Sequence, residues 1–172
     1  MYKVVAETIF ELSQDKKYLG AQPGFFSILH TWGQDLHFHP HIHTVVLAGG
    51  LNKMNKWHRS GDKFFIPVKV LSKKFRGKYL YFLKQYYQEK LLAFYGDAKQ
   101  YENPELFQKL LDQCYEKDWY SYAKEPFSGP LAVVKYLGRY THRIAISNQR
   151  IVSMDENTVT IAVKDYKEGT VS

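Results

Sequence analysis

The sequence is poor in cysteine and has no long apolar run, and each absence excludes a class of protein. Its 172 residues include one cysteine, Cys114, so neither an intramolecular disulfide nor a zinc site made of cysteines can form. No apolar run approaches the roughly 18 residues that a membrane span needs, and the first residues lack the apolar core of a signal peptide. We therefore expect a cytoplasmic protein with no membrane partner.

Acidic residues are the minority, and the charge is unevenly distributed. The chain has 24 Lys and Arg against 17 Asp and Glu, a formal net charge of +7, which favours an anionic partner. Residues 50–99 carry 12 basic and 3 acidic side chains, whereas residues 100–128 carry 3 basic and 6 acidic ones. A polyanion would therefore meet the central segment first.

The order of apolar residues predicts strands and helices in separate blocks. Residues 24–30 and 41–47 are rich in aromatic and β-branched side chains, which predicts two neighbouring antiparallel strands. Residues 143–163 favour a β-hairpin that turns at 155–157. We further expect an opening helix that ends near Gly20, a short strand over 64–70, and helices over about 71–95, from Asn103-Pro104 and from Pro130.

This grouping favours an α+β fold with a mostly antiparallel sheet over a doubly wound fold. With 45% apolar residues, a chain of this length has room for one domain. We expect residues 1–172 to form that domain, with a helical insertion at about 71–124 that is first basic and then acidic.

Histidines are concentrated in one place, since four of the seven fall within residues 37–43. On a strand, His41 and His43 project from the same face while Ile42 points to the other, because side chains alternate with a period of two. Two adjacent imidazoles can hold one divalent ion. The alternative is a set of ordinary hydrogen-bonded histidines on a wet strand or loop.

A metal ion held by two histidines usually needs a third protein ligand. His39 lies on the same face by counting, but Pro40 bends the chain there. We favour His30, because an antiparallel return of the chain could bring it beside the pair. Gln34 and Asp35 are weaker candidates in the connecting loop.

Two tyrosines, Tyr136 and Tyr140, lie four residues apart on a predicted helix and therefore share one face. Arg139 and Arg143 are close by in the sequence. In a chain with 14 tyrosines, core packing is the alternative interpretation of such a pair.

Together these motifs resemble one family, the two-tyrosine HUH transposases, which are rolling-circle insertion-sequence transposases of the type numbered ninety-one. The similar stretches are His30-Thr-Trp-Gly33, His39-Pro-His-Ile-His43 followed by Gly49-Gly50, and Lys135-Tyr-Leu-Gly-Arg-Tyr-Thr-His-Arg-Ile-Ala-Ile146. Their order and separation fit the family, and the resemblance covers about residues 22–168. It implies a ferredoxin-like sheet of the HUH endonuclease type with helices packed on it.

The resemblance also implies a chemistry, namely cleavage and transfer of single-stranded DNA or melted transposon ends. His41, His43 and His30 would hold a divalent metal ion, Mg²⁺ or Mn²⁺. Tyr136 and Tyr140 would attack the DNA, each forming a 5′-phosphotyrosine link and freeing a 3′ hydroxyl. Because the link keeps the energy of the broken bond, strands could be rejoined without ATP.

Basic and aromatic residues supply candidates for DNA contacts. An exposed basic helix end is the alternative for the two arginines near the tyrosines, and core packing is the alternative for each aromatic residue. The basic candidates are Arg139, Arg143, Lys73, Lys74, Arg76 and Lys78, and Trp57, Tyr79, Tyr81 and Phe82 could stack on bases.

One departure from the family concerns a cysteine-rich zinc-binding region that its members generally carry upstream. This chain has one cysteine, so we expect a catalytic-domain fragment or a shortened relative. Three other interpretations stay open: a replication initiator or relaxase with the same chemistry, a non-catalytic single-stranded nucleic-acid-binding module, and a decayed transposon remnant.

Overall fold

The structure, a computed structural model, describes residues 1–33, 35–61, 66–124, 126–141 and 146–163, with the backbone alone at 139–141. The chain forms two compact units: unit 1 comprises Met1–Phe25 and Val46–Pro126, and unit 2 comprises Phe26–Val45 and Phe127–Ser172. In chain order the described elements are α1 (Tyr2–Gln14), β1 (Gln22–Trp32), β2 (Phe38–Leu51), β3 (Trp57–Arg59), α2 (Val68–Gln88), the 3-10 helix η1 (Gly96–Glu102), α3 (Pro104–Glu116), α4 (Pro130–Thr141), the 3-10 helix η2 (Asn148–Arg150), β4 (Ile151–Met154) and β5 (Val159–Ile161).

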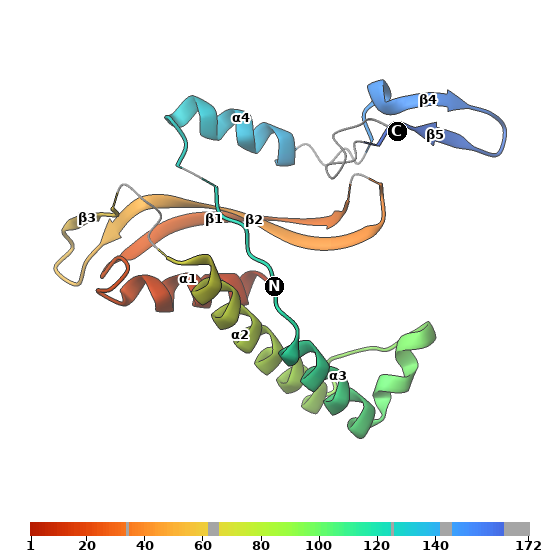
Figure 1. The fold of residues 1–172 in the computed structure, drawn as a ribbon, viewed down its shortest axis with the longest axis horizontal. Coiled ribbons are helices and arrows are strands. Elements are labelled where there is room, and N and C mark those ends of the chain that lie inside the picture. The colour runs from red at the N-terminus through yellow and green to blue at the C-terminus, as the bar shows by residue number, and fades with distance from the viewer. Residues whose placement is uncertain (34, 62–65, 125, 142–145, 164–172) are drawn as a thin grey trace. The chain divides into compact units, whose positions relative to one another are not determined.

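The α+β fold with an antiparallel sheet is confirmed (Figure 1). Three strands pair in the order β1-β2-β3, and β1 and β2 are the two strands expected around the histidines. Strand β3 was not predicted from the sequence and pairs antiparallel with the end of β2. No helix in the described part of the chain combines the length and the apolar character needed to cross a membrane.

Two glycines allow the end of β2 to lie close to its neighbours in unit 1. A Cβ atom at Gly50 would overlap the backbone of Gln22 and Pro23. At Gly49 a Cβ would lie only 2.5 Å from the indole ring of Trp57, which crosses this position. The Gly49-Gly50 pair is therefore explained by close packing on both sides of the strand.

The helices of unit 1 pack in sequence, α1 on α2 and α2 on α3. Leu80 of α2 meets Phe107 and Leu111 of α3 in a buried cluster, and the Tyr87 ring stacks on Phe107 with centroids 3.8 Å apart. The predicted start of α3 is confirmed, because the Asn103 side chain accepts hydrogen bonds from the first-turn amides. Helices α2 and α3 cover most of residues 71–124. The assignment of that segment as an insertion in a single domain stays a prediction.

Strands β1 and β2 extend past the predicted ranges 24–30 and 41–47 at both ends. Three further assignments in unit 1 differ from the sequence prediction. Helix α1 ends at Gln14 and not near Gly20, because the Asp15 carbonyl accepts the amides of residues 18–20 in a tight turn. Residues 66–70 are not a strand, since α2 begins at Val68; residues 62–65 lie outside the described residues. Helix α2 ends at Gln88, well before residue 95.

The described part of unit 2 contains segments of β1 and β2, helix α4 and the β4–β5 hairpin. Helix α4 begins at Pro130 as expected. The predicted hairpin is present but shorter, and residues 142–145 lie outside the description. Its turn is held by Asp155, whose carboxylate accepts hydrogen bonds from Asn157 and Thr158. The Thr158 hydroxyl bond is the main reason that the pKa of Asp155 lies below its usual value.

Candidate active site

Two neighbouring strands bring three histidines of unit 2 together. His41 and His43 alternate with Ile42 on β2, and His30 lies on β1. Their ring centroids are 5.5 Å (His30–His41), 5.1 Å (His30–His43) and 4.8 Å (His41–His43) apart. A hydrogen bond of 2.9 Å between the hydroxyls of Ser27 and Thr44 joins the same strands. The cluster therefore rests on regular strands and not on a loop.

The donor chemistry of this cluster fits a divalent metal ion. One ring nitrogen from each of the three half-buried histidines lies within 4.8 Å of the others. Nitrogens bound to one ion at about 2.1 Å are about 3.0–3.4 Å apart in octahedral or tetrahedral geometry. Side-chain rotations that bring the ring nitrogens closer by at most about 1.8 Å would therefore complete the set. Imidazole nitrogens suit first-row transition metals better than Mg²⁺, which prefers oxygen.

The backbone carbonyl of His39 fixes the orientation of the His41 ring. Nδ1 of His41 lies 2.7 Å from the backbone carbonyl oxygen of His39. A carbonyl can only accept, so Nδ1 carries the proton and, in a neutral ring, Nε2 carries the lone pair. This is the usual arrangement of a metal-binding histidine. His39 thus contributes its backbone, and its own ring is absent from the three-histidine cluster.

An aromatic ring supports His30. The Trp32 indole stacks on the His30 imidazole with centroids 5.7 Å apart and planes 14° from parallel. Sequence reasoning did not assign this role to Trp32. The signal was the spacing of two along a strand, which places both side chains on one face.

The predicted tyrosine helix α4 brings Tyr136 to the cluster. Oη of Tyr136 lies 3.1 Å from Nδ1 of His43, in a hydrogen bond between residues 93 positions apart. Phe127 packs against the Tyr136 ring with centroids 5.0 Å apart, a contact for which the sequence carried no signal. A phenol oxygen held at a histidine cluster can serve as a nucleophile when it loses its proton.

The other predicted residues near this helix are described only in part. Tyr140 and Arg139 lie on α4, but the structure describes only their backbone. Arg143 and Gln34 lie outside the described residues. The assignments of these residues therefore stay predictions.

Asp35 and His37 lie between β1 and β2 and do not belong to the three-histidine cluster. The Asp35 carboxylate lies 2.8 Å from Nδ1 of His37. This hydrogen bond is the main reason that the pKa of Asp35 lies below its usual value. The Asp35 carboxylate is thus occupied by its hydrogen bond to His37.

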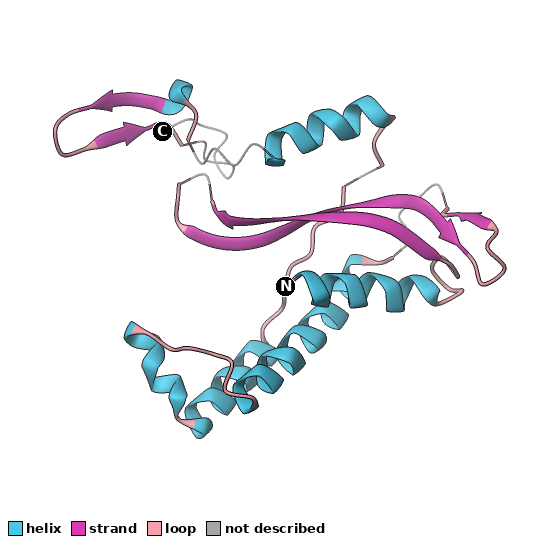
Figure 2. Cartoon of the chain, turned by 180° about the vertical axis from the view of Figure 1, so that it is seen from behind, coloured by secondary structure: helices cyan, strands magenta, loops and turns pink. Residues whose placement is uncertain are grey.

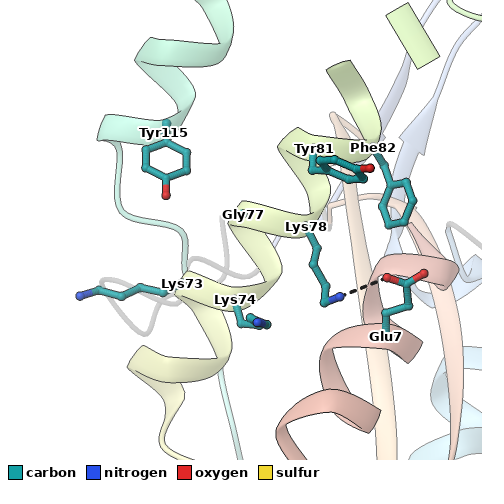
Figure 3. Close-up of a pocket in the computed structure, with 8 residues that line it drawn as sticks. All are labelled: Glu7, Lys73, Lys74, Gly77, Lys78, Tyr81, Phe82 and Tyr115. Atoms are coloured by element: carbon teal, nitrogen blue, oxygen red, sulfur yellow. Dashed lines mark hydrogen bonds and ion pairs between the residues drawn. The ribbon is translucent and has the colours of Figure 1, made fainter. Parts of the chain in front are cut away.

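The basic DNA-binding candidates of α2 lie in unit 1, and most of them contact other parts of that unit. Figure 3 shows one of these contacts, between Lys78 and Glu7. Lys78 pairs with Glu7 at 3.1 Å and with Glu11 at 2.9 Å, and Lys74 also pairs with Glu11. Hydrogen bonds from Lys74 and Lys78 lower the pKa of Glu11, and the Glu11 carboxylate raises the pKa of Lys78. These two lysines therefore join α2 to α1.

The remaining basic candidates of α2 differ from each other. Arg76 donates a hydrogen bond of 2.7 Å to the carbonyl of Lys117 and lies over the Tyr115 ring. Lys73 is exposed, has no ion-pair partner among the residues that the structure describes, and points away from Glu7 in Figure 3. Of the four basic candidates on α2, Lys73 is thus the one best placed to meet a ligand.

The aromatic candidates for base stacking fall into two groups, exposed rings and rings packed against other side chains. Trp57 and Tyr81 are exposed, whereas Tyr79 packs against Trp119 and Phe82 lies under the Lys3 ammonium. The exposed rings are available to stack on bases, and the packed ones hold unit 1 together.

Comparison with known proteins adds an independent finding. Residues 24–172 match the Y2_Tnp family, described as "Putative transposase". The chain is 40% identical over 170 residues to "Putative transposase y4qJ" of Sinorhizobium fredii, covering 98% of this chain and 43% of that protein. It is 24% identical over 158 residues to "Transposase for insertion sequence element IS801" of Pseudomonas savastanoi pv. phaseolicola, covering 84% of this chain and 35% of that protein.

The chain thus spans less than half the length of these two relatives. No solved structure matches it.

Proposed function

Since this chain belongs to the transposase family that its sequence matches, we propose that it carries the nicking and joining activity of a transposase in the cytoplasm. DNA is the substrate class of the family. The proposed reaction is the cleavage of single-stranded DNA through a 5′-phosphotyrosine intermediate, as in rolling-circle transposition. The observation that carries the proposal is the hydrogen bond between Tyr136 and His43, a member of the three-histidine cluster.

Tyr136 is the proposed nucleophile. Its phenol oxygen would attack the phosphorus of a phosphodiester and form a new oxygen–phosphorus bond, while the bond to the 3′ oxygen breaks. The phenol loses its proton to solvent, and the departing 3′ oxygen takes up a proton from solvent, leaving a 3′ hydroxyl. The reverse reaction by another 3′ hydroxyl would join the strands and release the tyrosine.

The histidines of this chain would hold the reacting groups in place. His30, His41 and His43 would bind a divalent ion, Mg²⁺ or Mn²⁺, whose charge stabilises the non-bridging phosphate oxygens. If Nε2 of His43 binds the ion, Nδ1 would carry the ring proton and donate a hydrogen bond to Oη of Tyr136, which would orient the phenol. Trp32 and the His39 carbonyl fix the orientation of the neighbouring rings.

Tyr140 is the proposed second nucleophile. It follows Tyr136 by one helical turn on α4, so two strands could be held covalently in succession. Arg139, Arg143 and the basic residues Lys73, Lys74, Arg76 and Lys78 are proposed to contact DNA phosphates.

The first test detects the covalent intermediate. The chain is incubated with labelled single-stranded oligonucleotides and Mn²⁺ or Mg²⁺, then analysed by denaturing gel and peptide mass spectrometry. We expect a DNA adduct on Tyr136 or Tyr140 that does not form in the presence of EDTA. The double variant Tyr136→Phe, Tyr140→Phe should lower adduct formation by roughly 1,000-fold or more.

Tyr86→Phe, on helix α2, serves as the matched control and should form the adduct at the normal rate. Undiminished adduct formation by the double variant would remove these tyrosines from the mechanism.

A further inference from the structure

A segment of unit 1 that the proposed function does not use has the character of a nucleic-acid-binding surface. Residues 117–124, here named the strap, follow α3 without forming helix or strand (Figure 2). Their side chains alternate in burial: Trp119, Ser121 and Ala123 are partly buried, while Tyr120, Tyr122 and Lys124 are exposed. A period of two indicates an extended chain that lies on the surface with one face outward.

Three contacts fix the inner face of the strap to α2. Arg76 donates to the Lys117 carbonyl at 2.7 Å, and the amide of Ser121 donates to Oγ of Ser72 at 3.1 Å. Between them, the Trp119 ring packs against Phe75 and Tyr79, with centroids 6.0 and 5.3 Å away. These contacts hold the strap on α2 without a ligand, and such pre-organisation reduces the entropic cost of binding.

The outer face presents two tyrosines with almost no protein contact. Tyr120 is 96% exposed and Tyr122 is 85% exposed. In an extended chain, residues two apart are about 6.6 Å apart. This is roughly twice the spacing of about 3.4 Å between stacked nucleotides along one strand of a duplex. Bases that stack on both rings must therefore be separated from each other, which a single strand allows and a duplex does not.

The charges beside these rings suit a phosphate backbone. Lys73 follows Ser72, the residue that holds the strap, and Lys69 lies one turn earlier on α2. Lys117 and Lys124 belong to the strap itself, which has one acidic residue, Asp118, and is bordered in the sequence by Glu116 and Glu125. The basic residues on and beside the strap, Lys69 and Lys73 included, therefore outnumber these three acidic ones by one. Exposed aromatic rings among lysines are the combination that single-stranded nucleic acids bind, whereas an acidic protein segment would gain little from the rings.

We propose that Tyr120 and Tyr122, flanked by Lys73 and Lys124, form a base-stacking site for single-stranded DNA on unit 1. The choice of DNA rests on the proposed function, and the site is additional to the histidine–tyrosine cluster of unit 2. The site holds a flanking part of the strand and takes no part in the chemical step.

The test measures the affinity of the complete chain for a fluorescent 20-nucleotide single strand by anisotropy, with EDTA present so that no cleavage occurs. Tyr120→Ala and Tyr122→Ala should each weaken binding by about tenfold. Replacement of both by Phe keeps the rings and should leave affinity within about threefold of the unaltered chain. Tyr95→Ala, which removes a tyrosine that is 80% exposed on the same unit, is the matched control and should bind normally.

A second measurement locates the DNA directly. A strand that contains 5-iodouracil is cross-linked by light, and we expect the modified peptides to carry Tyr120 or Tyr122. Binding of the same sequence as a duplex should not change in the alanine variants. Unchanged single-strand affinity of the double alanine variant, or an equal loss for the duplex, would overturn the inference and leave this face to a protein partner.

The outcome is separable from that of the proposed function. If Tyr136 forms an adduct while the double alanine variant binds normally, only the stacking site is wrong. If the chain binds single strands through the strap and forms no adduct, the stacking site holds and the nuclease mechanism is wrong. A chain that fails to bind the single strand at all would overturn the stacking site.

Discussion

At the scale of single residues, the composition of the histidine cluster predicts which ions bind. The three donors are imidazole nitrogens, and such donors favour first-row transition metals over Mg²⁺. We therefore expect Mn²⁺ to bind more tightly than Mg²⁺, and Co²⁺ or Ni²⁺ more tightly than Mn²⁺. Isothermal titration calorimetry on the chain without DNA measures this order independently of cleavage.

Variants of the cluster provide the control for this prediction. His43→Ala removes a donor and should weaken Mn²⁺ binding by at least about 100-fold. His39→Ala keeps the carbonyl that orients His41 and should bind Mn²⁺ within about threefold of the unaltered chain. Equal affinity for Mg²⁺ and Mn²⁺ would contradict the prediction.

The residues of this cluster differ in how far the sequence predicts them. His41 and His43 follow from the period of a strand, and His30 follows from an antiparallel return, because both arguments are local. The contact between Tyr136 and His43 joins residues 93 positions apart, and spacing carries no information at that distance. The resemblance to a known family indicated that pair, and the structure supplies the contact itself.

At the scale of elements, the end of helix α2 shows why the apolar pattern predicts a helix end that is too late, near residue 95 instead of Gln88. The amides of Lys90 and Leu91 donate to the carbonyls of Tyr87 and Tyr86, which is a Schellman motif. Its left-handed position, with φ of +56°, is occupied by Lys90 and not by glycine. The usual sequence signal for a helix end is therefore missing, and the apolar pattern continued past it.

That position predicts a stabilising substitution. Lys90→Gly removes the steric conflict of a side chain in the left-handed region and should raise the free energy of unfolding by about 1 kcal/mol. Urea denaturation at 25 °C measures the change. Lys73→Gly, at an exposed position inside α2, should lower the same quantity by about 1 kcal/mol; a loss of stability at Lys90→Gly would contradict the assignment of strain.

Strand β3 is a second element that sequence patterns did not predict. It has three residues, all of them exposed, so it lacks both the length and the apolar alternation on which strand prediction depends. Its position follows from pairing with the end of β2, where Gly49 and Gly50 permit close approach of Trp57 and Gln22. By contrast, α3 was predicted because Asn103 and Pro104 are local signals for a helix start.

At the scale of the whole molecule, the balance of charge predicts how stability depends on pH. Lys74 and Lys78 lower the pKa of Glu11, so the stability that this carboxylate contributes is present above its ordinary pKa of 4.5 and is lost as pH falls through the lowered value. Glu11 raises the pKa of Lys78 above its ordinary 10.5, so that contribution is present below 10.5 and is lost only as pH rises through the raised value. Between these limits both contributions are complete.

Acid should therefore destabilise the chain for two reasons that act together. The Glu11 pairs are lost, and protonation of the 17 acidic residues leaves 24 Lys and Arg and 7 His without countercharge, so the compact state repels itself. We expect the urea midpoint to be nearly constant from about pH 6 to 9 and to fall steeply below the ordinary carboxyl pKa of about 4.

Glu11→Gln separates the two causes, because it removes the pairs at every pH. At pH 7 it should cost less than about 1 kcal/mol, as expected for a partly exposed ion pair, and the variant should then lose less further stability in acid than the unaltered chain. An identical acid dependence in both proteins would assign the whole loss to general repulsion.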